Sequence, residues 1–244
     1  QNVNPTVDPV RDLEIIETEM KLADLDSIQK RLDKKNKKNT SENELNILES
    51  ALKCINNNES FELLINNFGK KEINQVGLLS TKPSLYVCNV DEKSILKGNK
   101  YTDEFIKKYG ENNTIIISAD IENQINGLNY EEKTNYMKMI DLKETGLNIL
   151  IKKGYKLLEL QTFFTSGPEE SRAWTITKNS LAPAAAGVIH SDFEKGFIRA
   201  ETVSYDDFVE CNGWLNSKNN GKLILEGKDY LVKDGDILNF RFIT

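Results

Sequence analysis

Cysteine and histidine are scarce in this chain. Its three cysteines, Cys54, Cys88 and Cys211, are an odd number at wide spacing, so neither a disulfide framework nor a metal-ligand pattern is present and a reducing compartment is expected. His190 is the only histidine, which excludes a zinc site or a mechanism built on several histidines. No apolar stretch approaches the roughly 20 residues that span a bilayer, and no signal peptide is present. We therefore expect a cytoplasmic protein with no membrane partner.

An excess of positive charge is also missing. The chain has 32 Lys and Arg against 38 Asp and Glu, a formal net charge of -6. This balance argues against a general nucleic-acid coat and against DNA as a partner, and leaves only local basic patches. The chain starts without Met, and residues 1–9 have no fold signature. We interpret the sequence as a fragment of a longer protein.

The first region, about residues 12–74, has the apolar spacing of helices. Apolar residues recur at intervals of three and four, first at Leu13, Ile16 and Met20, next at Leu22, Leu25, Ile28 and Leu32, and then at Leu45, Leu48, Leu52 and Ile55. A Lys- and Asn-rich segment, 34–39, separates the runs, and Ser41 with Glu44 has the spacing of a capping box. This pattern predicts an antiparallel helical hairpin (coiled coil) over residues 10–78 with a basic tip.

The second region, residues 79–157, alternates strand and helix. Apolar runs at 84–88 and 114–117 predict strands, with a helix over 100–109 that ends at Gly110. This is a βαβ unit with a parallel pair of strands. Helical patterns also cover 129–140 and 146–152.

The third region, residues 158–244, has mostly strand patterns. Strands are predicted over 158–164 and 173–176 with a turn at 166–168, and again over 198–203. An Ala-rich helix over 183–191, a short acidic helix over 205–210 and two strands joined at Asp234-Gly235 complete the pattern. Strands around one helix in fewer than 90 residues predict a β-grasp module. Overall the fold class is α/β.

Polar residues follow both predicted parallel strands. Asn89-Val90-Asp91-Glu92 comes after the first strand, and Ser118-Ala119-Asp120 after the second. Ligands of open α/β sheets bind in the crevice outside such strand ends. An Asn side chain both donates and accepts hydrogen bonds, and exposed main-chain N–H and C=O groups do the same. Each loop alone is an ordinary turn, and only the pair at this spacing indicates a site for the edge of a purine.

Several strings resemble the Obg-like ATPases (the YchF family), most specifically their TGS domain. The resemblance rests on residues 154–158, 182–201 and 229–236, on Asn89-x-x-Glu92, on Leu22-Ala23-Asp24-Leu25-Asp26 and on Lys82-Pro83. It covers nearly the whole chain, and the Lys- and Asn-rich hairpin tip departs from it most.

The resemblance implies a P-loop-type G domain, present only in part. Residues 1–9 would be a residual segment of that domain and 79–157 its C-terminal part, with the helical hairpin 10–78 inserted between them and a TGS domain over 158–244. It also implies base-binding residues, namely Asn89, Val90, Glu92, Ser118 and Ala119. A Glu in place of the guanine-reading Asp, and Val90 where a Lys would stack, imply ATP preferred over GTP. The full-length parent would bind and hydrolyse ATP with Mg²⁺ and engage the ribosome.

The phosphate-binding sequence is absent from these 244 residues. No Gly-x-x-x-x-Gly-Lys-Ser/Thr occurs, since Gly69-Lys70 and Gly221-Lys222 lack the first Gly and the Ser/Thr. No Asp-x-x-Gly occurs that would serve a magnesium switch. We therefore expect no catalytic residue and no metal ligand in this chain, no ATP turnover, and no tight binding of ATP or Mg²⁺.

Basic residues are the candidates for contacts to ribosomal RNA or protein. Those at the hairpin tip are Lys34, Lys35, Lys37 and Lys38, with Lys30 and Arg31 behind them, and those in the third region are Arg172, Lys178, Lys195 and Arg199. The alternative for each group is a solvated surface without a partner.

Other chemically suggestive residues have structural interpretations. We expect His190 to cap the Ala-rich helix. We expect Trp174, Phe193 and Phe197 to form a small core, although they could also stack on RNA bases. Asp206, Asp207 and Glu210 are expected to be structural.

Two functions remain open from the sequence. The first is part of an Obg-like ATPase that retains base recognition and the TGS binding platform. The second is a nucleotide-independent module that binds the ribosome or its RNA.

Overall fold

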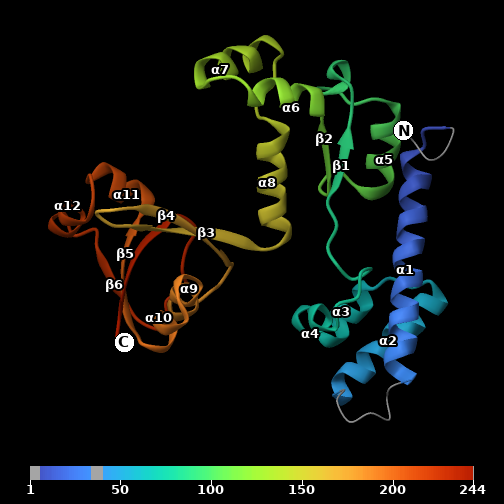
Figure 1. The fold of residues 1–244 in the computed structure, drawn as a ribbon, viewed down its shortest axis with the longest axis horizontal. Helices are drawn as coiled ribbons and strands as arrows, with labels where there is room; N and C mark the ends of the chain where they lie inside the picture. Colours follow the sequence, from blue (N-terminus) through green and yellow to red (C-terminus); the bar gives the residue numbers. More distant parts are fainter. Residues whose placement is uncertain (1–5, 34–40, 244) are drawn as a thin grey trace. The chain divides into compact units, whose positions relative to one another are not determined.

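The computed structural model describes residues 6–33 and 41–243. It divides into two compact units, Gln1–Leu150 and Ile151–Thr244, which we describe separately (Figure 1). The division lies within helix α8 (Gly146–Leu157), whereas the sequence placed the domain boundary after residue 157. The finer division into four segments stays a prediction. None of the helices in the described ranges is long and apolar enough to cross a membrane.

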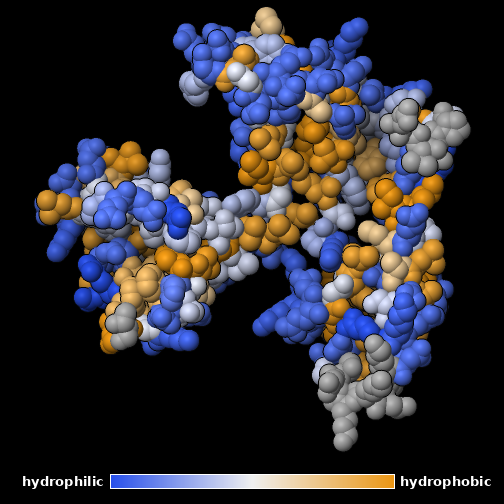
Figure 2. Space-filling view, in the orientation of Figure 1, coloured by the Kyte–Doolittle hydropathy of each residue, from blue (hydrophilic) through white to orange (hydrophobic). Residues whose placement is uncertain are grey.

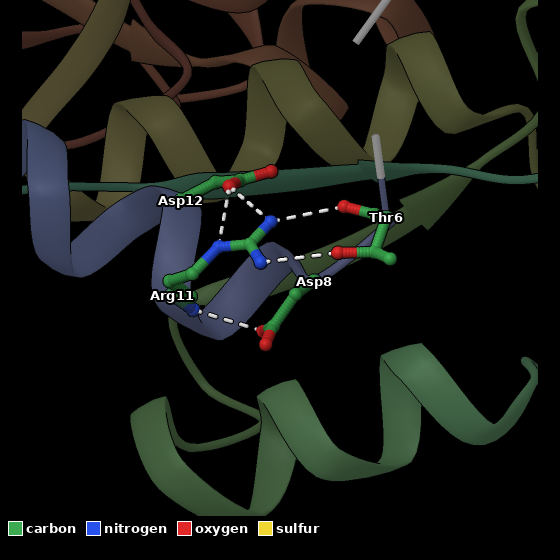
Figure 3. Close-up of polar contacts among 4 residues, drawn as sticks. All are labelled: Thr6, Asp8, Arg11 and Asp12. Atoms are coloured by element: carbon green, nitrogen blue, oxygen red, sulfur yellow. Dashed lines mark hydrogen bonds and ion pairs between the residues drawn. The ribbon is translucent and has the colours of Figure 1, made fainter. Parts of the chain in front are cut away.

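Helix α1 (Pro9–Asp33) begins at a polar clamp (Figure 3). The Asp8 carboxylate accepts the main-chain N–H of Arg11 at 3.0 Å. The Arg11 guanidinium donates to the carbonyl oxygen of Thr6 at 2.9 Å and to its hydroxyl at 3.1 Å, and it also contacts Asp12. These bonds satisfy a free N–H of the first helical turn and fix the entering chain. Residues 6–9 therefore form a cap at the start of α1, which the sequence did not indicate.

The predicted helical hairpin is present, with a second arm broken into three helices. These are α2 (Glu42–Asn57), α3 (Glu62–Phe68) and α4 (Lys70–Val76). Breaks occur at Asn58, which adopts the left-handed conformation, and at Gly69 with φ of 88°. The hydrophobic core of this part is formed by Ile28, Ile47, Leu48, Ala51, Cys54, Leu64, Ile73, Val76 and Leu78.

Only half of the predicted capping box at the start of α2 forms. The Ser41 hydroxyl accepts the Glu44 N–H at 3.2 Å, as expected. The Glu44 carboxylate does not return to the cap but pairs with Arg31, which also donates to the Val76 carbonyl at 2.9 Å. An ion pair to the other arm of the hairpin therefore replaces the local bond.

The parallel strand pair is confirmed. Strand β1 (Tyr86–Asn89) pairs in parallel with β2 (Thr114–Ile117), and Asn89 lies opposite Ile117. Helix α5 (Lys100–Tyr109) connects them and begins at the capping box of Asn99 with Thr102. Strand β1 starts two residues later than predicted.

Three further helices complete the first unit. They are α6 (Ala119–Asn126), α7 (Tyr130–Met139) and the first turn of α8. The prediction of a loop at 118–120 is wrong, because Ser118 is the N-cap of α6 and the helix follows β2 directly. Its buried residues Ile121 and Ile125 have the spacing of four that a helix buries on one face.

The second unit is a five-stranded sheet in the order β4-β3-β7-β5-β6. Its strands are β3 (Leu160–Ser166), β4 (Ser171–Thr177), β5 (Phe197–Ser204), β6 (Ile224–Glu226) and β7 (Asp236–Phe242). Strands β3 and β7 are parallel, and the other pairs are antiparallel. Helices α9 (Ala182–Ile189) and α10 (Ser191–Lys195) share a core with the sheet that includes Phe163, Ala200, Leu238 and Phe240. This arrangement confirms the β-grasp prediction.

Two details of the second unit differ from the predictions. The Ala-rich helix stops at Ile189 and a second short helix, α10, follows after His190. The segment before Asp234-Gly235 is not a full strand but a single bridge between Leu231 and Leu181. Between β5 and β6 lie α11 (Tyr205–Glu210), as predicted, and α12 (Trp214–Asn219), which the sequence did not indicate.

Candidate nucleotide-base site

The two polar segments that follow the parallel strands meet in the structure. The Asn89 side-chain oxygen accepts the main-chain N–H of Ala119 at 2.9 Å. Asn89 is the last residue of β1 and Ala119 the first of α6, so one hydrogen bond joins the carboxyl ends of both strands. This bond assigns the orientation of the amide, and the Asn89 nitrogen remains as a donor.

Val90 has fewer free main-chain groups for a ligand than the sequence predicted. Its N–H donates to the Ile117 carbonyl at 2.8 Å and therefore extends the β1–β2 pairing. The sequence predicted that the main-chain N–H and C=O groups of this loop are both available to a ligand. For the N–H of Val90 this prediction is wrong, because the group is already hydrogen-bonded. Its carbonyl receives no hydrogen bond from any of the described residues. The pair presented here is thus one donor, from Asn89, and one acceptor, from Val90.

The side chain of Glu92 is bound by a residue of the neighbouring helix α6. Its carboxylate accepts the side-chain N–H of Gln124 at 2.8 Å, and the Tyr136 hydroxyl donates to the oxygen of the same Gln124 amide. Glu92 opens the 3₁₀ turn η2 (Glu92–Ser94), which Asp91 caps by accepting the Ser94 N–H at 3.0 Å. Sequence reasoning missed Gln124 and Tyr136, because it predicted no helix over residues 119–126.

Ser118 is buried rather than exposed to a ligand. Its side chain is 0% exposed, and its hydroxyl has no partner among the described residues. As the N-cap of α6 it makes no side-chain cap bond. Contact between this segment and a base would therefore come from the Ala119 end of the segment.

Two hollows border the residues of the Asn89–Ala119 bond. One groove of about 480 Å³ contains Asn89 and Val90 and has apolar walls that include Leu13, Tyr101 and Phe105. Another, of about 420 Å³, contains Ala119 and is lined by residues of α6, α7 and α8. Cys88 borders the first groove, and burial raises the pKa of its thiol, so it is not an activated nucleophile.

Glu122 fixes the helix that bounds the second hollow. Its carboxylate accepts the main-chain N–H groups of Gly146 at 2.5 Å and Leu147 at 3.3 Å, at the start of α8. Gly146 is buried here, and a Cβ at that position would lie 2.5 Å from a methyl of Ile117. The contact therefore requires glycine.

Possible metal ligands are not clustered in the part of the chain that the structure describes. The described ranges contain no group of three or more His, Cys, Asp or Glu side chains that would hold a metal ion. The donor set at Asn89 and Val90 fits the edge of a purine ring but not Mg²⁺, which prefers carboxylate and phosphate oxygens.

The candidate cations of the hairpin tip are described only in part. Lys34, Lys35, Lys37 and Lys38 lie outside the described residues. Behind them, Lys30 pairs with Asp26 at 2.6 Å, and Arg31 pairs with Glu44. Both flanking charges are thus neutralised within the hairpin.

Cations of the second unit are dispersed. Arg172 lies over the Trp174 ring at 5.0 Å on β4, whereas Arg199 lies on β5, with β3 and β7 between them. Lys195 is exposed at the end of α10. Their role in binding RNA or the ribosome stays a prediction.

The structural interpretation is confirmed for His190, the three aromatic residues and Asp207, and it stays a prediction for Asp206 and Glu210. His190 ends α9, and its ring nitrogen accepts the Asp192 N–H at 3.2 Å, so it caps the two successive helices. Trp174, Phe193 and Phe197 belong to the core of the second unit. Asp207 caps α11 with Ser204 and pairs with Lys222 at 2.8 Å.

A family model and several known proteins are similar in sequence to this chain. A family model described as "YchF-GTPase_C: Protein of unknown function (DUF933)" matches residues 160–243. The "Ribosome-binding ATPase YchF" of Escherichia coli O157:H7 is 41% identical over 249 residues, which cover 99% of this chain and 68% of that protein. The protein of the same description from Bacillus subtilis is 40% identical over 252 residues, with 99% and 69% covered.

Solved structures agree with the sequence comparison. The "Schizosaccharomyces pombe YchF GTPase" superposes with a TM-score of 0.82 at 29% identity and covers 99% of this chain and 68% of its own. A GTP binding protein from Pyrococcus horikoshii superposes with a TM-score of 0.56 at 17% identity, covering 98% of this chain and 73% of its own, which shows the fold alone.

Proposed function

The chain belongs to the YchF family, and from that premise we propose that it forms the base-reading and ribosome-binding part of a cytoplasmic protein that hydrolyses ATP, and GTP less well. The observation that carries this proposal is the hydrogen bond between Asn89 and Ala119, because it brings both polar segments to one point at the carboxyl end of the strands.

Base recognition would use groups that remain available after folding. Asn89 would donate to a ring nitrogen and the Val90 carbonyl would accept from the exocyclic amine of adenine. Ala119 would set the position of Asn89 through their hydrogen bond. Ser118, which is buried, would anchor the segment without contacting the base. Glu92 is one methylene longer than the Asp that reads guanine, and its Oε1 already accepts from Gln124, so its pairing with the two donors of guanine would be disturbed. ATP would therefore be preferred over GTP.

Phosphate chemistry would lie outside these residues. In the relatives' reaction, Mg²⁺ neutralises charge that develops on the phosphates. The described residues contain no group of three or more possible metal ligands, and the sequence contains no P-loop. We therefore expect the 244 residues to bind the base weakly and to hydrolyse no ATP.

Two substitutions of Asn89 separate recognition from structure. Asn89→Asp keeps an oxygen for the Ala119 N–H but removes the donor nitrogen, and Asn89→Ala removes both. Nuclear magnetic resonance titration with adenosine should shift the Ala119 amide of the parent protein. Both variants should bind adenosine about tenfold more weakly, the equivalent of about 1.4 kcal/mol.

The state without ligand provides the internal control. The Ala119 amide signal should keep its position in Asn89→Asp and move in Asn89→Ala. Asn113→Asp makes the same chemical change at the opposite end of β2 and should leave adenosine binding unchanged. ATP turnover by the purified chain that disappears on changing Asn89 would overturn the proposal.

The alternative function is a ribosome-binding module that ignores nucleotides. In its favour, Asn89 and Glu92 already have partners within the protein. The same titration distinguishes the two, because the module would bind ribosomes while adenosine shifts no signal near Asn89.

A further inference from the structure

The outer part of the second unit contains a groove that the proposed function does not use. It has a volume of about 560 Å³, and residues of β5, β7, β6 and α12 line it. Its charged and polar lining consists of Arg199, Glu201, Lys218, Asn239 and Arg241, and its apolar lining of Trp214, Leu215, Leu223 and Leu225.

Two arginines lie side by side in the floor of the groove, an arrangement that destabilises the sheet. Arg199 lies directly opposite Arg241 on the neighbouring strand, a like-charge pair that weakens a sheet. Glu201 compensates only one of the two, since its carboxylate accepts from Arg241 at 3.2 Å and from Asn239 at 2.8 Å. Within residues 6–33 and 41–243, neither Arg199 nor Lys218 has an ion-pair partner. The groove is thus positive in an acidic protein.

The rim of the groove is apolar and exposed. Leu215 is 73% exposed and Leu225 is 54% exposed. In Figure 2 apolar surface lies beside hydrophilic surface at the place that α12 takes in Figure 1. Trp214 is anchored, because its indole N–H donates to the Ser166 carbonyl at 2.8 Å and its ring packs edge-on against Phe208. A preformed pocket with a fixed Trp and free Arg has the composition of a protein-binding hot spot.

We propose that this groove binds a segment of a partner protein that carries both acidic and aliphatic side chains. Its carboxylates would pair with Arg199 and Lys218, and its aliphatic side chains would cover Leu215 and Leu225. A nucleic-acid strand fits less well. The Glu201 carboxylate in the floor repels phosphate, and the rim is mainly leucine, whereas bases stack on aromatic faces. The proposal goes beyond the proposed function and does not depend on base recognition.

The test uses the full chain and a defined probe. A synthetic peptide, acetyl-Asp-Glu-Leu-Leu-Glu-Asp-Leu-amide, is titrated by calorimetry and by resonance shifts of the Trp214 indole N–H. Arg199→Glu with Lys218→Glu should weaken binding at least about tenfold, and Leu215→Ser should do so through loss of apolar contact. Lys228→Glu, an exposed lysine outside the groove, should leave binding unchanged.

Control probes distinguish the classes of partner. A peptide with Lys at the acidic positions, and one with Ser at the leucine positions, should bind at least about tenfold more weakly. Lys218 and Leu215 are exposed, so their variants should keep the parent's unfolding midpoint, whereas Arg199→Glu, which places an opposite charge across from Arg241, should keep or raise it. Absence of acidic-peptide binding, equal binding by the charge-reversed variant, or preferential binding of a uridine hexanucleotide would each overturn the proposal.

Discussion

Asn89 shows how one side chain can serve both the fold and the site. Its oxygen takes the Ala119 N–H, which leaves the nitrogen as the only free part of the amide. A residue type with a single polar function would either join the two segments or face a ligand. This dual use would explain why an amide, rather than a carboxylate, suits the end of β1.

Gly146 is the residue at which packing tolerates no side chain. Gly146→Ala would place its Cβ 2.5 Å from a methyl of Ile117 and 3.0 Å from the Glu122 carboxylate. Ile117 is branched and lies in a strand, so it cannot rotate away without disturbing β2. We expect a loss of about 1–3 kcal/mol in the free energy of unfolding. Urea unfolding followed by circular dichroism measures it.

Gly154→Ala is the matched control in the same helix. Nothing lies within 4 Å of a Cβ built there, so the change should be neutral or should stabilise α8 by up to about 1 kcal/mol. Equal effects of the two substitutions would contradict the close packing of Gly146 on β2.

At the scale of elements, a polar link ties the segment before β7 to that strand. The Tyr230 hydroxyl donates to the Asp236 carboxylate at 2.7 Å, and the Lys233 N–H donates to the same oxygen at 2.8 Å. Burial, and then the hydrogen bond to Asp236, raise the pKa of Tyr230 well above its ordinary value. The link therefore requires a protonated tyrosine.

This link predicts a loss of stability in alkali. The folded protein holds the Tyr230 proton more tightly than the unfolded chain, so the contribution is fully present below the unfolded pKa of about 10 and falls as pH rises above it. Tyr230→Phe should cost about 0.5–1.5 kcal/mol at neutral pH and reduce the alkaline slope. Guanidinium unfolding followed by tryptophan fluorescence tests this, since Trp174 and Trp214 both lie in the second unit. Identical slopes for parent and variant would refute it.

Most elements were predictable because their periodicity is strong and their ends carry caps. The helix Lys100–Tyr109 and the strand Thr114–Ile117 match their predictions. Helix α6 was missed, because Ser118 reads as a polar turn although it is buried, and its burial depends on the whole unit. Helix α12 was also missed. It begins after Gly213, which has no side chain that could cap the helix and so gives no sign of a helix start in the sequence.

At the scale of the whole molecule, the sequence indicated the meeting of the two polar segments but not its geometry. Strand order brought Asn89 and Ala119 to one edge, as the βαβ pattern predicts. The partners of Glu92 and the occupied N–H of Val90 depend on how α6 and β2 fold, which local patterns do not encode. The groove at Arg199 was also hidden, since its lining comes from segments 199–241 that meet only in the folded sheet.

Ribosome binding by an acidic protein needs a local positive region. Changing Lys34, Lys35, Lys37 and Lys38 together to Glu should weaken co-sedimentation with ribosomes and flatten its salt dependence, because each lysine that neutralises a phosphate adds roughly 0.7 to 0.9 to the slope. Reversing four exposed lysines elsewhere, Lys97, Lys107, Lys143 and Lys228, changes the net charge equally and should have a smaller effect. Equal effects would remove the hairpin tip from the ribosome contact.

The ratio of affinities for ATP and adenosine tests the central claim most directly. The claim is that these residues recognise the base and not the phosphates. Titration with each ligand, followed at the amide signals of Asn89 and Ala119, should give affinities within about threefold of each other, a difference of less than 1 kcal/mol. ATP bound about a hundredfold more tightly than adenosine, a gain of about 2.7 kcal/mol, would contradict the account.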